Sequence, residues 1–122
     1  MNQGIFQVVF NSVGALASSP VYTWLAPMDC TLLHVSAVNS TAYAGSVDVG
    51  SSADADGYLA AMAVGVSAAP AQKGYPTPAD FAGAHALGAY PHIVDGTIVK
   101  VTVTDHGSHM ADFCVVLTFS AG

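Results

Sequence analysis

Charged side chains are scarce in this sequence, at 8% of its 122 residues against about a quarter in ordinary soluble domains. Glu and Arg are absent, every acid is Asp, and the only Lys residues are Lys73 and Lys100. With a net charge of −6 and no Arg, the chain cannot neutralise a row of phosphates, so we expect no binding to nucleic acid. The missing Glu also excludes Glu acid/base pairs, HExxH zinc hydrolysis and Glu-assisted zinc deamination.

Long hydrophobic runs are missing too, although 52% of the residues are hydrophobic. The longest charge-free hydrophobic stretch, residues 57–72, is interrupted by Gly65 and Pro70 and is shorter than the roughly 20 apolar residues of a membrane span. We therefore expect no membrane segment. Residues 1–6 lack the basic and apolar regions of a secretory signal, which predicts synthesis in a cytoplasm.

Cysteine is represented only by Cys30 and Cys114, which lie far apart in the sequence, each within an expected strand. In a reducing compartment such residues are small buried hydrophobic side chains more often than disulfide partners. We predict that they are unpaired, and comparison of reduced and unreduced protein would decide between the alternatives.

Apolar residues alternate with a period of two along most of the chain, and helical spacing is hard to find. This pattern predicts an all-β protein, in which residues 1–122 form one domain: a two-sheet sandwich or jelly roll of about eight short antiparallel strands. Proline and glycine are frequent in residues 67–95, which we interpret as a long loop region around one short strand near Phe81. The other expected strands are residues 5–10, 21–26, 31–38, 46–49, 58–66, 98–104 and 112–119.

Several of these strands carry more detailed expectations. Residues 31–38 have apolar side chains on both faces, which predicts a central strand. Val47 and Val49 are expected to point inward. Residues 98–104 and 112–119 are expected to form an antiparallel hairpin whose apolar face is covered by the second sheet.

Sheet edges in monomeric proteins are usually blunted by Lys or other charges, and this chain has few to use. Self-association would cover both the edges and the weakly charged faces. We therefore predict a homo-oligomer that closes into a ring.

Candidate catalytic and metal sites are weak in this sequence. Four residues are of types that can bind a metal: Asp105, His106, His109 and Asp112. They lie at an expected turn, however, and Asp, His, Gly and Ser are common in solvated turns. Residues 51–57 begin like a calcium loop and lack its Glu, so we interpret them as a turn as well. Ser108 has no GxSxG elbow around it, and no phosphate-binding loop is present. We predict no catalytic, cofactor-binding or metal-binding residue.

Aromatic residues are better candidates for contact with a partner. We expect Tyr22, Trp24 and Tyr58 to cover the core of the sandwich. The expected interface residues are Ile5 and Phe6 at the start of the first strand, with Tyr75, Phe81 and Tyr90 in the region rich in proline and glycine.

Four segments together resemble the small head decoration, or capsid cement, proteins of tailed bacteriophages, which have jelly-roll-like β folds. These segments are residues 21–32, 49–59, 91–99 and 111–119, and the resemblance covers most of the chain. It implies a non-enzymatic virion protein, a trimer without cofactors, that binds the major capsid protein on the outside of the head and stabilises it against genome pressure. Residues 68–90 are longer and richer in proline than a minimal jelly-roll connection, and no binding residue is carried over.

Two other functions remain as alternatives. The first is a jelly-roll module of a virion that binds carbohydrate or a host surface through loop aromatics and Asp. The second is a cupin-like or hydrolytic enzyme, which ranks last because Glu, Arg and a recognisable triad are missing.

Overall fold

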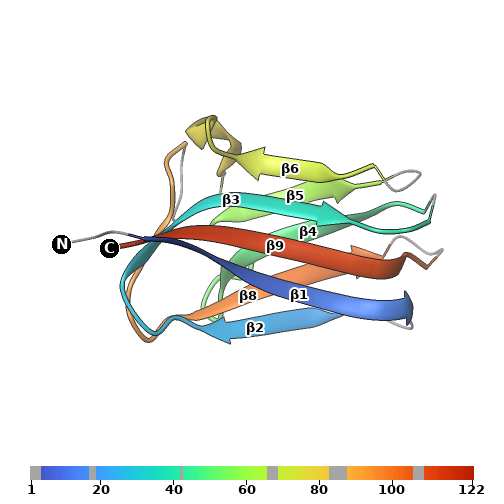
Figure 1. The fold of residues 1–122 in the computed structure, drawn as a ribbon, viewed down its shortest axis with the longest axis horizontal. Helices are drawn as coiled ribbons and strands as arrows, with labels where there is room; N and C mark the ends of the chain where they lie inside the picture. The colour runs from blue at the N-terminus through green and yellow to red at the C-terminus, as the bar shows by residue number, and fades with distance from the viewer. Residues whose placement is uncertain (1–3, 17–18, 42, 66–68, 83–87, 106–108) are drawn as a thin grey trace.

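A computed structural model describes residues 4–16, 19–41, 43–65, 69–82, 88–105 and 109–122. These residues form nine strands and one short 3-10 turn, and none of their helical turns is long and apolar enough to cross a membrane (Figure 1). The elements are β1 (Ile5–Ala15), β2 (Val21–Leu25), β3 (Cys30–Val38), β4 (Gly45–Ser51), β5 (Leu59–Val64), β6 (Ala71–Gly74), η1 (Pro78–Asp80), β7 (His92–Ile93), β8 (Ile98–Asp105) and β9 (Ala111–Ala121).

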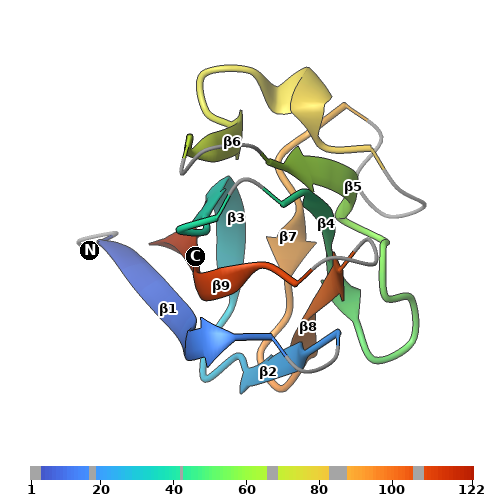
Figure 2. The ribbon, with the colours of Figure 1, turned by 90° about the vertical axis from the view of Figure 1, so that its right-hand side faces the viewer.

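The strands form two antiparallel sheets that face each other (Figure 2). Sheet A has the order β1-β9-β3-β6, with short β7 beside β3, and sheet B has the order β2-β8-β4-β5. The pairs β1·β9, β2·β8, β3·β6 and β4·β5 are nested, as if one long antiparallel hairpin had been wrapped into two sheets. This is the strand arrangement of a jelly roll. The predicted all-β sandwich is confirmed, although β1 and β9 are longer than expected, at 11 residues each.

The core lies between the sheets and is built from alternate residues of each strand. Val47 and Val49 of β4 point inward, as predicted. The predicted hairpin of the last two long strands is wrong, because β8 pairs with β2 and β4 in sheet B while β9 pairs with β1 and β3 in sheet A. Their apolar rows meet across the core. A period of two shows which face of a strand is buried, but not whether the next strand lies beside it or opposite it.

Strand β3 is central in sheet A, as predicted, between β9 and the pair β6 and β7. A bulge between Leu32 and His34 shifts its register against β9. Leu32 therefore points inward before the bulge and Val35 after it, while Leu33 and His34 are both half-buried. The bulge explains why both faces of this strand carry apolar side chains.

Aromatic rings close the sandwich between β1 and β2. Phe119 of β9 is fully buried, with its ring centroid 5.3 Å from that of Phe6 and 4.9 Å from that of Trp24. Phe10 stacks on Tyr22 at 5.2 Å. As expected, Tyr22 and Trp24 pack against the core while staying partly exposed, and Tyr58 is buried.

The region rich in proline and glycine is only partly loop. In its described residues it contains β6, η1 and β7. The short strand expected near Phe81 is wrong for residues 78–82, and residues 83–87 lie outside the described part of the chain. The Phe81 backbone instead closes η1, with its N–H donating to the Pro78 carbonyl oxygen at 3.1 Å. The Phe81 ring is fully buried, so it anchors this region to the core.

Both cysteines are unpaired, as predicted. Cys30 lies opposite Ala121, and Cys114 lies opposite Val38 at the other end of β3. A rise of about 3.3 Å per residue along β3 separates these positions by roughly 26 Å, far beyond disulfide reach. Cys30 is buried, whereas Cys114 is half-exposed on the outside of sheet A.

Candidate interaction surface

The outer face of sheet A is uncharged over its central strands, apart from the titratable ring of His34. On β1, inward Phe6, Val8 and Phe10 alternate with outward residues, among them Ile5 and Val9, which are 69% and 54% exposed. We call this surface the sheet A face. It consists of Ile5, Gln7, Val9 and Asn11 on β1, Cys114, Val116, Thr118 and Ser120 on β9, and Thr31, Leu33, His34, Ser36 and Val38 on β3.

The outer face of sheet B has a different character. Lys100 of β8 and Asp48 of β4 both lie on it, among Thr23 and Thr102. Three exposed apolar residues also lie on this face: Val21, Leu25 and Ile98. Charges of both signs and hydroxyl groups are typical of a surface in contact with water. The two faces of the sandwich therefore differ in charge, and the sheet A face, which holds no Lys and no Asp, is the better candidate for contact with another protein.

An apolar groove of about 450 Å³ runs across one end of the sheet A face, lined by Ile5, Leu33, His34, Tyr75 and Thr118. Ile5 comes from one edge of the sheet and Tyr75 from the segment that follows β6 at the other edge. Both are about two-thirds exposed, at 69% and 67%. The fold thus brings two of the predicted interface residues to one groove, although 69 positions separate them.

Tyr75 is held at this groove by a tight approach of β6 to β3. The Tyr75 N–H donates to the Leu33 carbonyl oxygen at 2.8 Å. Gly74, just before it, has φ of 117°, and a Cβ there would lie 2.3 Å from the same oxygen. Only glycine fits such a position, so Gly74 fixes where Tyr75 leaves the sheet.

The other predicted interface residues lie elsewhere. Phe6 is on the inner side of β1, 6.0 Å from the ring of Trp24. Tyr90 is half-buried and meets Phe81 edge-to-face, with centroids 5.9 Å apart. The fully buried Phe81 offers no surface to a partner, which corrects its expected role. The sequence pattern placed Phe81 and Tyr90 in a loop because proline and glycine surround them, although burial is the ordinary position of a Phe ring.

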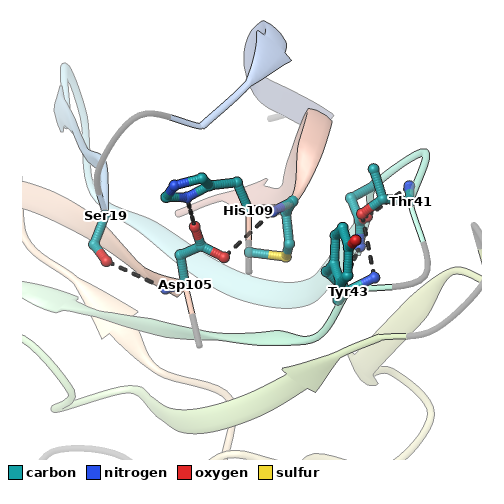
Figure 3. A network of polar contacts seen from close by, with 7 residues as sticks. Ser19, Thr41, Tyr43, Asp105 and His109 are labelled. Atoms are coloured by element: carbon teal, nitrogen blue, oxygen red, sulfur yellow. Dashed lines mark hydrogen bonds and ion pairs between the residues drawn. The ribbon is translucent and has the colours of Figure 1, made fainter. Parts of the chain in front are cut away.

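The connection between β8 and β9 carries a short polar network (Figure 3). His109 Nδ1 and Asp105 Oδ2 lie 2.7 Å apart, and Asp105 Oδ1 accepts a hydrogen bond from the Met110 N–H at 3.2 Å. The Ser19 hydroxyl oxygen accepts from the Asp105 N–H. Asp105 therefore orders the chain where it passes between the sheets, and the described residues hold no group of three potential metal ligands. His106 and Ser108 lie outside the described residues.

Asp112 belongs to a separate contact at the far end of β1. Its carboxylate accepts hydrogen bonds from the Gly14 N–H at 2.8 Å and the Ser40 hydroxyl at 2.9 Å. These two bonds, the first more than the second, lower the pKa of Asp112 below its ordinary value. Asp112 and Asp105 thus have separate partners, and the contact ties the ends of β1, β3 and β9 together.

We expect this contact to make stability depend on pH. Because the folded-state pKa is lowered, the contact stabilises the protein above the ordinary pKa of Asp and is lost as pH falls through the lowered value. Replacing Asp112→Asn should lower the melting temperature by a few degrees at pH 7, and the difference from wild type should shrink below about pH 4. Thermal unfolding at pH 7 and pH 3 measures both. An equal difference at the two pH values would contradict this assignment.

A second depression, of about 510 Å³, lies at the end of the sandwich where residues 51–53 approach residues 92–98. Its lining includes Ser51, Ser52, Thr97 and His92 together with the apolar residues Val94 and Ile98. Tyr58 also reaches it with little exposed surface, and burial raises the pKa of its phenol. In the nearby turn, a hydrogen bond and the charge of Asp54 raise the pKa of Asp56.

Comparison with known proteins gives a likeness of fold. No protein-family model matches the chain, and no curated protein sequence matches it. A solved structure titled as the capsid asymmetric unit of the cyanophage Pam1 is similar to it over 99% of this chain and 86% of the other, with a TM-score of 0.54 and 19% sequence identity. The two chains share a fold.

Proposed function

We propose that this chain is a non-enzymatic structural protein of a virion, which decorates and stabilises the outside of a bacteriophage capsid. The observation that carries this proposal is the sheet A face, an uncharged surface with exposed Ile5 and Val9 on a chain whose net charge is −6. A fold shared with a chain of a phage capsid unit supports it.

Such a role needs contact area rather than reactive groups. A stable protein interface covers about 800 Å² on each partner, which is roughly an eighth of the 6019 Å² surface of this chain. The sheet A face and its groove supply apolar surface without charges that would have to be desolvated. We propose a trimer, the stoichiometry implied by the family resemblance, because a trimer that touches several capsid sites at once gains effective concentration.

The most direct experiment tests whether the chain co-purifies with virions. Particles should be purified on a density gradient from cultures that carry the gene, and the chain quantified by mass spectrometry. We expect it in DNA-filled particles, in a fixed ratio to the major capsid protein. Recovery of the chain only in the soluble fraction would overturn the proposal.

Variants at the groove test which surface makes the contact. Tyr75→Ala and Ile5→Ala should each weaken binding to particles that lack the chain by about 5- to 30-fold, the effect of a contact worth about 1–2 kcal/mol. Their melting temperatures should stay close to wild type because both side chains are mostly exposed. Phe81→Ala serves as a contrast. Because the Phe81 ring is fully buried, this variant should lower the melting temperature, which the two groove variants should not. Wild-type binding by both groove variants in a co-sedimentation assay would count against the groove.

Sugar binding by a virion module is the second candidate function. The depression beside Tyr58 favours it, because Ser51, Ser52 and Thr97 in its lining carry hydroxyl groups that can hydrogen-bond to sugars. A glycan array is the appropriate test. Bound glycans that are lost in a Thr97→Val variant would support this function over the structural one, and an array without binding would remove it.

A further inference from the structure

Strand β1 is an unprotected edge of sheet A. Among the described residues it pairs with β9 on one side and with no strand on the other (Figure 2). From Ile5 to Ser12 it pairs with β9 in one continuous register, which shifts only between Ser12 and Ala15. The strand includes no charge and no proline, two of the features that usually prevent a strand edge from pairing with another chain. An edge of this length and composition is a template for a further strand.

The other edge strands are shorter and better protected. Strand β2 has five residues and lies between Pro20 and Pro27. Strand β5 has six residues and is interrupted at Ala61, where φ is 51°. Strand β6 has four residues, one of them Lys73. None of these matches β1 in length, so β1 of a second copy is the best-matched partner that this chain can supply.

The backbone groups at the free edge can be assigned from one hydrogen bond. The Ala121 N–H donates to the Gly4 carbonyl oxygen at 2.9 Å, in register with the pairing of Ile5 opposite Ser120. In an antiparallel ladder, hydrogen-bonded pairs alternate with non-hydrogen-bonded pairs. From Ile5 to Ser12, where the register is continuous, even-numbered residues therefore bond to β9, and the N–H and C=O groups of odd-numbered residues point to the free edge.

When two copies of β1 run antiparallel, the odd-numbered residues of one copy can lie opposite residues of the same type in the other. If two copies meet antiparallel with Val9 opposite Val9, then Gln7 lies opposite Asn11. Ile5 then faces Val13, which lies just beyond the regular part of β1, where the register shifts between Ser12 and Ala15. Amide meets amide and apolar meets apolar at each pair, as favourable cross-strand contacts require. Shifting the register by two residues places Val9 opposite Gln7 or Asn11 and loses this match.

Charge also favours this approach of two copies. Each chain carries a net charge of −6, so copies repel one another over most orientations. Strand β1 contains no Asp, and neither does the part of β9 from Cys114 to Ser120 beside it. Asp112 lies beyond this part, bonded to the Gly14 N–H at the end of β1, so two copies that meet along β1 keep their acidic residues away from the centre of the contact.

We propose that β1 is a self-association site, at which two copies join edge to edge across a two-fold axis through Val9 and continue sheet A from one copy into the other. The exposed side chains of Ile5, Val9 and Val13 become partly covered in this pairing. A two-fold contact does not build a trimer. In a trimeric assembly it would join protomers of two neighbouring trimers. The outward residues of β1 also belong to the sheet A face, but self-association is a property of the isolated protein and does not depend on the virion role.

Charged variants at Val9 test both the site and its register. Val9→Lys and Val9→Asp each place two like charges directly opposite one another, which destabilises the pairing. Each variant alone should lose β1-mediated association, and an equal mixture should regain it because Lys then faces Asp. Light scattering reports the mass, with the wild type expected at twice 12.3 kDa, or at twice the mass of a trimer.

Two controls exclude a general effect of added charge and a loss of folding. Val21→Lys adds the same charge to an exposed position on edge strand β2 and should leave the association intact. Circular dichroism should show folded protein for every variant, since the Val9 side chain points outward. A mixture that stays dissociated would overturn the two-fold register. A trimer whose mass does not change in the Val9 variants would overturn β1 as the site, while leaving the virion proposal untouched.

Discussion

Replacing Phe119→Ala should destabilise the protein by about 3–5 kcal/mol, the usual cost of removing a buried aromatic ring. Phe119 is fully buried on β9, and its ring contacts Phe6 of β1 and Trp24 of β2. The substitution therefore opens a cavity where the margins of both sheets meet. Denaturant titration measures the loss, and a fall in melting temperature of roughly 10–20 °C should accompany it.

Two controls separate this effect from a general loss of hydrophobic residues. Phe119→Leu keeps most of the volume and should cost less than about 1.5 kcal/mol. Val13→Ala removes an apolar group that is 94% exposed and should leave the free energy of unfolding of the single chain nearly unchanged. If Phe119→Ala costs no more than Val13→Ala, the assignment of Phe119 to the junction of the sheets is wrong.

Replacing Gly74→Ala should cost about 2–4 kcal/mol and disrupt the groove at the same time. The added Cβ meets the Leu33 carbonyl oxygen at 2.3 Å and the Cα of His34 at 2.8 Å, both backbone atoms of a central strand. The φ of 117° adds strain for any side chain. Strand β6 must move away from β3, and Tyr75 moves with it.

The matched control is Gly65→Ala, at a glycine where an added Cβ meets nothing within 4 Å. Chemical denaturation should show a large loss for Gly74→Ala and little change for Gly65→Ala. Binding to particles that lack the chain should fall for Gly74→Ala even at temperatures where it is fully folded. Equal stability of the two variants would contradict the close approach of β6 to β3.

The sequence predicted the side-chain pattern better than the arrangement of strands. Alternation identified the inward residues of β4, such as Val47, because a half-buried strand requires it. It did not identify the neighbours of β8 and β9, since a hairpin within one sheet and a crossing between sheets bury the same residues. The bulge at Leu33 and His34 also escaped prediction, because an extra residue in one strand is defined only against its partner.

The candidate surface was predicted in part. Ile5 and Tyr75 were chosen separately, and only the fold shows that they line one groove. Phe81 was misplaced because its surroundings in sequence are typical of a loop, while its ring is held in the core. Alternation along each strand indicates which residues point outward, and the sequence shows that few of them are charged. That β1, β9 and β3 lie in one sheet and form one uncharged face required the structure.

Electron cryomicroscopy of DNA-filled particles, purified from cultures that carry the gene, tests the central claim most directly. The account predicts density for this jelly roll on the particle exterior, with the sheet A face covered by neighbouring chains and the outer face of sheet B in contact with solvent. Particles without this chain, or with the sheet A face open to solvent, would contradict it.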